Sequence, residues 1–239
     1  MSGWLRAMGA LLCVIILISP ASAGEDLLAQ GAAAQKAGKN EQAVQLLGQY
    51  LQDHPDAAEA RRLRALALAA LKRQPEALEE VNRGLAAHPK SISLLLVQGR
   101  ILASLDRRPE AAAAFSRVIQ LDPKNVAAYT ERADSLAQQG NFAGAMKDFN
   151  RAVRLAPRDP WVVHKRGIIR FCQGKYQEAV ADFTRSIRMD PKEGAFYFPR
   201  GEVYLHHLHQ RDKALADFKE GCRLGNKLCC HELEMLEAK

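Results

Sequence analysis

The residues best able to do chemistry in this sequence are cysteines and histidines near its C-terminus. The group comprises three cysteines and four histidines: Cys222, Cys229, Cys230, His206, His207, His209 and His231. Thiolates and imidazoles bind Zn²⁺, but a zinc site needs several ligands at suitable spacing. Neither Cys-x-x-Cys nor His-Glu-x-x-His occurs, and the two clusters fall on different predicted elements. We therefore predict an exposed His-rich turn with no metal or other cofactor. A thiol- or metal-responsive C-terminus is the alternative.

Motifs of catalysis are missing from the sequence. It contains no Gly-x-Ser-x-Gly element, no phosphate-binding glycine-rich loop and no Cys-x-x-Cys-His haem site. Acidic residues are plentiful, but they fall on the expected solvated faces of helices. We predict that the protein is not an enzyme and has no catalytic residues.

The N-terminal segment, residues 1–23, has the features of a secretory signal peptide. One basic residue precedes an apolar run over 9–18, and Ala21-Ser22-Ala23 supplies small residues for a signal peptidase. We predict cleavage before Gly24, with an uncleaved N-terminal anchor as the alternative. The run is shorter than the roughly 20 residues of a membrane span, and no later segment is long and apolar enough for one. The mature chain is expected to be exported, periplasmic in a Gram-negative source and otherwise secreted, where disulfides can form.

The composition favours helices with a mixed-charge surface. Ala, Leu, Glu, Arg, Lys and Gln are abundant, and these are strong helix formers. The net charge of +7 invites a nucleic-acid interpretation. However, the basic residues are scattered among acidic ones, with no Lys/Arg block and no aromatic platform. We predict no nucleic-acid partner, and keep a charge-driven nucleic-acid binder as a further alternative.

A period of 34 residues runs through the chain. Five prolines share it: Pro55, Pro89, Pro123, Pro157 and Pro191. A column of small residues keeps the same step: Gly31, Ala65, Gly99, Ala133, Gly167 and Gly201. A second column is alanine throughout: Ala43, Ala77, Ala111, Ala145 and Ala179. A third is bulky and apolar: Leu47, Val81, Phe115, Phe149 and Phe183.

Each repeat is predicted to be two helices joined by a turn. The small residues lie on the first helix and the alanines on the second, because helices approach closely only where side chains are small. The bulky residue follows the alanine by four positions, on the same helical face, and is expected to fill the space away from the crossing. Each proline ends the second helix, since it lacks an N–H and moves the preceding residue out of the helical region.

This pattern resembles the tetratricopeptide repeat family. The clearest units span 126–159 and 160–193, which carry Gly140-Asn141-Phe142 and Gly174-Lys175-Tyr176 in their turns. The resemblance covers nearly all of the mature chain. It implies an all-α, right-handed superhelical solenoid of about six 34-residue helix-turn-helix units, in which each unit contacts only its neighbours.

The resemblance also sets the expected boundaries. The array spans 24–226, in units of about 24–57, 58–91, 92–125, 126–159, 160–193 and 194–226. The last unit carries one inserted residue in its His-rich turn. A capping helix over 227–239 is expected to close the array, with Leu228, Leu233 and Leu236 facing the last unit.

A binding surface is implied by the same resemblance, because in this family the first helices line a concave face. The matching positions form a partly aromatic groove: Trp161, His164, Ile168, Phe171, Phe198, Glu202 and Leu205. The alternative is that Trp161, Phe171 and Phe198 pack between units or under the capping helix. Family members that grip a C-terminal carboxylate use a Lys/Asn/Arg clamp. Here the residue one turn after Arg62 is Leu66 rather than Asn, so an apolar or helical peptide is the better ligand.

The cysteines near the C-terminus are similar to those of Sel1-like repeats, which are relatives of this family. Those repeats bridge two cysteines eight positions apart, and Cys222 and Cys230 keep that spacing. The resemblance implies a disulfide that staples the capping helix, leaving Cys172 and Cys229 free.

The predicted function is that of an exported adaptor or scaffold for other proteins. It would bind peptide segments or helices of partners in the groove and support assembly or localisation of envelope or secretion components. No stable membrane insertion is expected after signal cleavage.

Overall fold

The computed structural model describes residues 20–237, and each regular element in that range is a helix. The helices follow one another in pairs: α1 (Pro20–Lys36) and α2 (Asn40–Asp53), α3 (Ala58–Ala70) and α4 (Gln74–Ala87), α5 (Ile92–Ser104) and α6 (Arg108–Leu121), α7 (Val126–Gln138) and α8 (Phe142–Leu155), α9 (Pro160–Cys172) and α10 (Tyr176–Met189). The predicted all-α repeat solenoid is thereby confirmed. Most of the predicted signal peptide, residues 1–19, lies outside the described residues, and α1 begins just before the expected cleavage point.

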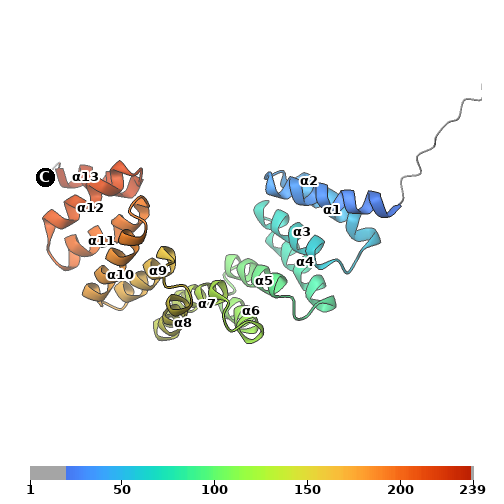
Figure 1. Cartoon of the computed structure of the whole chain (residues 1–239), viewed down its shortest axis with the longest axis horizontal. Helices are drawn as coiled ribbons and strands as arrows, with labels where there is room; N and C mark the ends of the chain where they lie inside the picture. The colour runs from blue at the N-terminus through green and yellow to red at the C-terminus, as the bar shows by residue number, and fades with distance from the viewer. Residues whose placement is uncertain (1–19, 238–239) are drawn as a thin grey trace, which may run out of the picture.

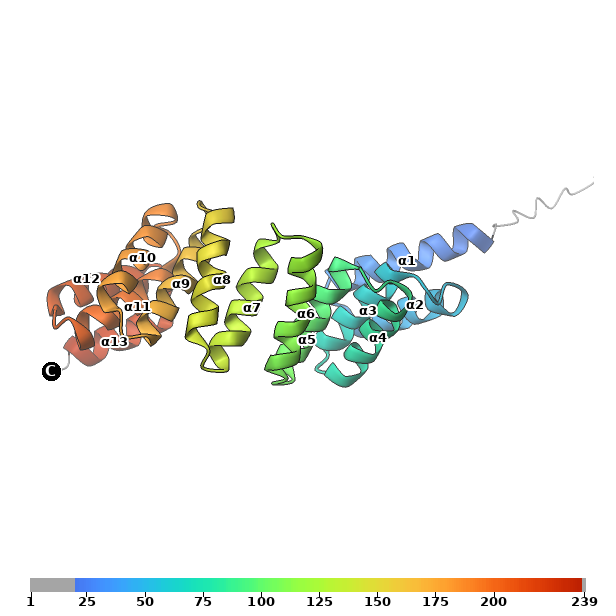
Figure 2. The same ribbon diagram turned by 90° about the horizontal axis from the view of Figure 1, so that it is seen from below.

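The pairs stack side by side into an elongated, curved array (Figures 1 and 2). In the N-terminal part of the array, successive first helices contact each other: α1 with α3, α3 with α5 and α5 with α7. In Figure 1, α5, α7 and α9 lie on the inner side of the arch, and α6, α8 and α10 lie on its outer side. The first helices therefore line the concave surface.

The periodic prolines end the second helices as predicted. In all five cases the helix stops two residues before the proline, at Asp53, Ala87, Leu121, Leu155 and Met189. The residue between them is not helical, for example Asp122 with φ −135° and ψ 91°, because the proline ring disfavours helical geometry there. Arginines of the next second helix then donate to proline carbonyls, as Arg185 Nη2 does to Pro157 O at 2.7 Å.

The small-residue and bulky columns meet directly at the helix crossing. A Cβ atom placed on Gly99 would lie 2.5 Å from the Phe115 ring, and one on Gly167 would lie 2.7 Å from Phe183. The expectation that the bulky side chain fills space away from the crossing is therefore wrong. The ring lies against the glycine itself, so the pair of residues sets how closely the two helices approach.

This contact predicts a context-dependent effect at Gly99. Gly99→Ala should lower the free energy of unfolding by about 2 kcal/mol, because the new methyl group overpacks the Phe115 ring. The same substitution in a Phe115→Val chain copies the Ala65 and Val81 pair and should be close to neutral, since alanine is the better helix former by about 1 kcal/mol. Urea unfolding of the four chains measures both effects. An equal loss in the two backgrounds would contradict this account.

The inserted residue of the last unit is absorbed in a π-helical turn. The first helix of this unit consists of η1 (Gly194–Phe196), α11 (Tyr197–Glu202) and the π-helical η2 (Val203–His207). A wider turn accommodates one extra residue without losing the backbone hydrogen bonds. His209, with φ +53°, then takes the turn position that Gly140 and Gly174 hold in earlier units.

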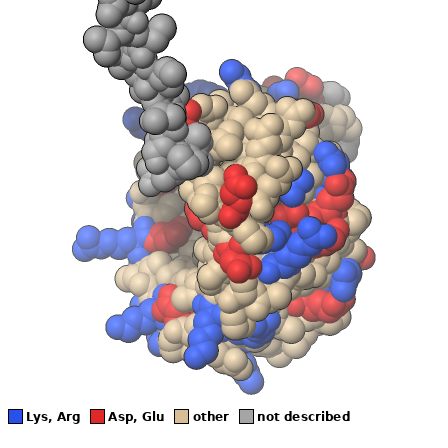
Figure 3. Space-filling model, turned by 90° about the vertical axis from the view of Figure 1, so that its right-hand side faces the viewer, with Lys and Arg blue, Asp and Glu red and all other residues tan. Residues whose placement is uncertain are grey.

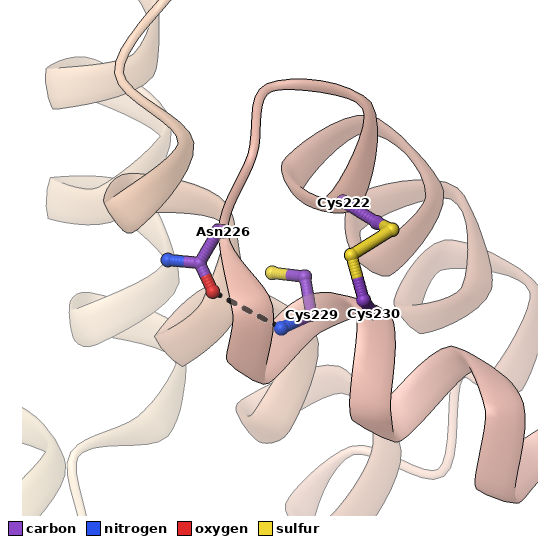
Figure 4. Close-up of a disulfide and its surroundings, with 4 residues drawn as sticks. All are labelled: Cys222, Asn226, Cys229 and Cys230. Carbon is purple, nitrogen blue, oxygen red and sulfur yellow. Dashed lines mark hydrogen bonds between the residues drawn. A yellow bond between two sulfur atoms is a disulfide. The ribbon is translucent and has the colours of Figure 1, made fainter.

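The array ends with α12 (Arg211–Arg223) and α13 (Lys227–Glu237). Asn226 caps α13, because its Oδ1 accepts from the Cys229 N–H at 3.0 Å (Figure 4). Leu236 is buried against the last unit, but Leu228 is 58% exposed, so its expected inward placement is wrong. Cys229 is the buried residue of this first turn and packs on Gly221, which rotates Leu228 outward.

Candidate functional site

A pocket of about 350 Å³ opens between α9 and α11 on the concave side. Its lining is mostly apolar, and two of the lining side chains, His164 and Glu202, are titratable. The lining residues are His164, Ile168, Phe171, Phe183, Ala195, Phe198, Pro199 and Glu202. Five of the seven predicted groove residues are among these. Because the pocket lies between the first helices of two successive units, its shape depends on how those units pack.

Trp161 and Ile168 are the exposed apolar residues of this region. Trp161 lies in the first turn of α9 and is 45% exposed, with its ring edge-to-face on Phe196 at a centroid distance of 4.8 Å. Ile168 lines the pocket and is 38% exposed. Both side chains are held from one side and open on the other, as an interface anchor requires.

Phe171, Phe198 and Leu205 also serve the packing of the last units. The ring centroids of Phe171 and His207 lie 5.3 Å apart, and those of Phe198 and Phe218 lie 6.2 Å apart. Leu205 packs in the cluster around Phe218 and is not among the pocket-lining residues. The packing alternative therefore describes part of the role of the two phenylalanines, while both still line the pocket.

His164 is a buried, neutral residue in the pocket wall. Burial, together with the smaller effect of the nearby Lys165 charge, lowers the pKa of His164 to about 4. Its ring lies 4.9 Å from that of Phe196, and its buried Nδ1 atom has no hydrogen-bond partner among the described residues.

Glu202 brings a carboxylate to the pocket lining. The pKa of Glu202 is raised, mainly because the carboxylate is partly buried. The nearby His206 lowers this pKa and the nearby Glu232 raises it. The arrangement therefore joins an apolar pocket, a neutral imidazole and one carboxylate, which suits an apolar side chain flanked by hydrogen-bonding backbone.

Buried ion pairs hold the two helices of a unit together behind the groove. Arg166 of α9 donates to both carboxylate oxygens of Asp182 on α10, at 2.8 and 2.6 Å. Arg200 and Asp217 repeat this in the last unit, at 2.9 and 2.6 Å. These arginines position the groove helices and were not among the predicted site residues, although their 34-residue spacing is visible in the sequence.

The alternative of one site built from the C-terminal cysteines and histidines finds no support among residues 20–237, where no metal-ligand group combines the two. The His207 ring stacks on Tyr176 at 4.0 Å, and burial is the main cause that raises the pKa of the Cys229 thiol to about 12. The Sγ atoms of Cys222 and Cys230 lie 2.05 Å apart (Figure 4). Cys172 is an exposed free cysteine rather than part of the pocket lining.

The end of the molecule nearest α1 to α4 has a mixed charge. Basic and acidic side chains alternate there (Figure 3), and several form neighbouring pairs on one helix, such as Arg62 with Glu59 and Arg83 with Glu79. A phosphate backbone requires an extended basic surface, and this face does not provide one. Within residues 20–237, no helix has the length and apolar content needed to cross a membrane.

One family model matches the sequence, and many solved structures have a similar fold. A model described as tetratricopeptide repeat matches residues 28–92, 96–160 and 164–226. No match was found among curated proteins.

Among solved structures, a tetratricopeptide repeat protein from Parabacteroides merdae is 24% identical with a TM-score of 0.72, covering 93% of this chain and 86% of its own. Pseudomonas aeruginosa pilF is 20% identical with a TM-score of 0.75, covering 91% and 98%. YrrB, described as having an unusual peptide-binding site, is 17% identical with a TM-score of 0.60, covering 79% and 97%. At these identities the structures show a shared fold.

Proposed function

Because the chain belongs to the tetratricopeptide repeat family, we propose that it is a scaffold that binds a peptide segment or helix of a partner protein in the groove between α9 and α11. The family and fold support a protein-interaction scaffold in general. The observation that carries the specific proposal is the apolar pocket between these helices, with Ile168 exposed in its lining and Trp161 exposed on the same helix.

The chemistry of the groove selects the kind of ligand. Apolar walls favour a large aliphatic or aromatic side chain, and burial of such a side chain contributes roughly 1.5 to 3 kcal/mol. The Glu202 carboxylate, which belongs to the pocket lining, offers a polar contact to the ligand. A protein of similar fold, YrrB, is described as having an unusual peptide-binding site, which supports peptide binding by a chain of this fold.

We propose that the protein acts outside the cytoplasm. The signal-like residues 1–23 and the sulfur atoms of Cys222 and Cys230 at bonding distance support it, since disulfides persist in oxidising compartments. The partners would then be envelope or secretion proteins. Mass spectrometry of the native protein tests both points: a mature chain beginning at Gly24 with one disulfide supports them, whereas an intact N-terminus with reduced cysteines opposes them.

The groove predicts which substitution weakens binding. Peptides selected from a random library on the mature chain should carry a large apolar residue, and Ile168→Ser should weaken their binding by about tenfold or more through lost apolar burial. Leu121→Ser is the matched control, since Leu121 is 40% exposed and lies outside the pocket, against 38% for Ile168. Fluorescence anisotropy gives both affinities. Equal weakening by the two variants, or none by either, would rule out this groove.

A further inference from the structure

Three potential metal ligands converge where the last unit meets the capping helix. They are Glu202 at the end of α11, His206 in η2 and Glu232 in α13, and one ligand atom of each lies within 4.8 Å of the others. Glu202 and His206 are four residues apart on one helical face, with Nε2 and Oε1 separated by 3.6 Å. The third ligand comes from a different helix, so the fold brings the three together.

We infer that Glu202, His206 and Glu232 bind a divalent transition-metal ion such as Zn²⁺. One imidazole and two carboxylates form a donor set that suits a borderline metal, and three protein ligands leave a coordination position for water or another ligand. This site is different from the Cys/His cluster that the sequence suggested, because it uses two glutamates and a single histidine.

The Glu202 carboxylate lacks a hydrogen bond at one oxygen, and the nearest basic group recorded for it is His206 at 3.6 Å. Its Oε1 atom is buried and has no hydrogen-bond partner among the described residues. A second carboxylate, that of Glu232, approaches it from the capping helix. Two like charges in a partly buried place repel each other, and His206 supplies at most one positive charge. A divalent cation at this position would satisfy the orphan oxygen and neutralise both carboxylates.

Local structure fixes the ligands before any metal arrives. The π-helical turn that absorbs the inserted residue carries His206, and such turns often occur at functional sites. Glu232 is two residues after Cys230, whose sulfur is at bonding distance from that of Cys222. The Asn226 cap further anchors the start of α13. Preorganised ligands reduce the entropic cost of binding.

The metal site shares Glu202 with the groove but can be tested without a groove ligand. Glu202 borders the pocket, but His206 and Glu232 are outside its lining. A test on the chain alone, with no peptide present, therefore separates a failure of this inference from a failure of the proposed function.

The test is titration of Zn²⁺, against a chromophoric competitor, into the untagged mature chain carrying Cys172→Ser. That substitution removes the exposed free thiol, which could bind zinc by itself. One equivalent should bind, and His206→Ala or Glu232→Gln should each weaken binding by at least about tenfold. His231→Ala is the control, because His231 is exposed and adjacent to Glu232 but outside the ligand group.

A second measurement locates the ion. Zn²⁺ should slow amide hydrogen exchange over residues 202–207 and 227–237 in the parent chain and in His231→Ala, but not in His206→Ala. His206 is more than half exposed, so its replacement leaves the core intact, and unchanged helical circular dichroism verifies this. The inference is overturned if the parent chain binds no Zn²⁺, or if binding survives both ligand substitutions.

Discussion

Asp148→Ala is expected to lower the free energy of unfolding by about 3 kcal/mol. Arg132 of α7 donates from Nε and Nη2 to the two oxygens of Asp148 on α8, each at 2.7 Å, and from Nη1 to Ser116 Oγ on α6 at 2.9 Å. One arginine thus joins three helices. Only 24% of its side chain and 8% of that of Asp148 are exposed. Removing the carboxylate leaves a largely buried guanidinium without its counter-charge.

The neighbouring unit supplies the matched control. At the equivalent positions it has Gln98 and Ala114, and Gln98 Nε2 donates to Asn82 Oδ1 at 2.8 Å. The double variant Arg132→Gln/Asp148→Ala copies that arrangement, so we expect it to recover at least about half of the lost stability, since no buried charge remains. Urea unfolding followed by circular dichroism measures the single and double variants. A double variant as unstable as Asp148→Ala would show that the unpaired arginine is not the cause.

The second large effect is a loss of stability in mild acid that originates at His164. Its pKa is about 4 in the folded chain, against 6.5 as the ordinary value. As the pH falls below 6.5, the unfolded chain takes up a proton that the folded chain does not. Stability is therefore complete above that pH and declines until the folded pKa is reached, by at most about 3 kcal/mol.

His164→Phe isolates this contribution. Phenylalanine keeps the aromatic contacts to Phe183 and Phe196 but does not titrate. Between about pH 7 and about pH 4.5, the parent chain should lose roughly 2 kcal/mol more stability than the variant, since the carboxylates contribute equally to both. Urea midpoints at the two pH values give the difference. Parallel losses in the two chains would mean that His164 is not held neutral by the fold.

The fold could be predicted because the repeat leaves the same signal many times. The prolines mark the end of each second helix and the small residues mark each helix crossing. A unit that departs from the pattern therefore does not change the predicted fold. The buried ion pairs left a comparable signal, since Arg132, Arg166 and Arg200 share the period and Asp148 and Asp182 follow by 16 positions. In the unit that lacks the arginine the acid is lost too, as Gln98 and Ala114 show, and that covariation would have identified the pairs.

The details of the site depend on packing that the repeat does not encode. Trp161 and Phe171 occupy the same helix, yet their exposure differs because different side chains of the following unit meet them. Leu228 faces solvent because Asn226 caps α13 and Cys229 fills the contact to Gly221. The grouping of Glu202, His206 and Glu232 depends on the π-helical turn that carries His206 and on the docking of the capping helix that carries Glu232. Both arise only in three dimensions.

The most direct test of the central claim is photo-cross-linking in native cells, with a photoreactive amino acid placed at position 168 or at position 121. The two positions are similarly exposed, and only Ile168 lies in the groove. The account predicts a discrete protein adduct from position 168 that is absent from position 121 and is lost by competition with a library-selected peptide. Adducts of equal yield from both positions, or none from position 168, would contradict binding of a partner in this groove.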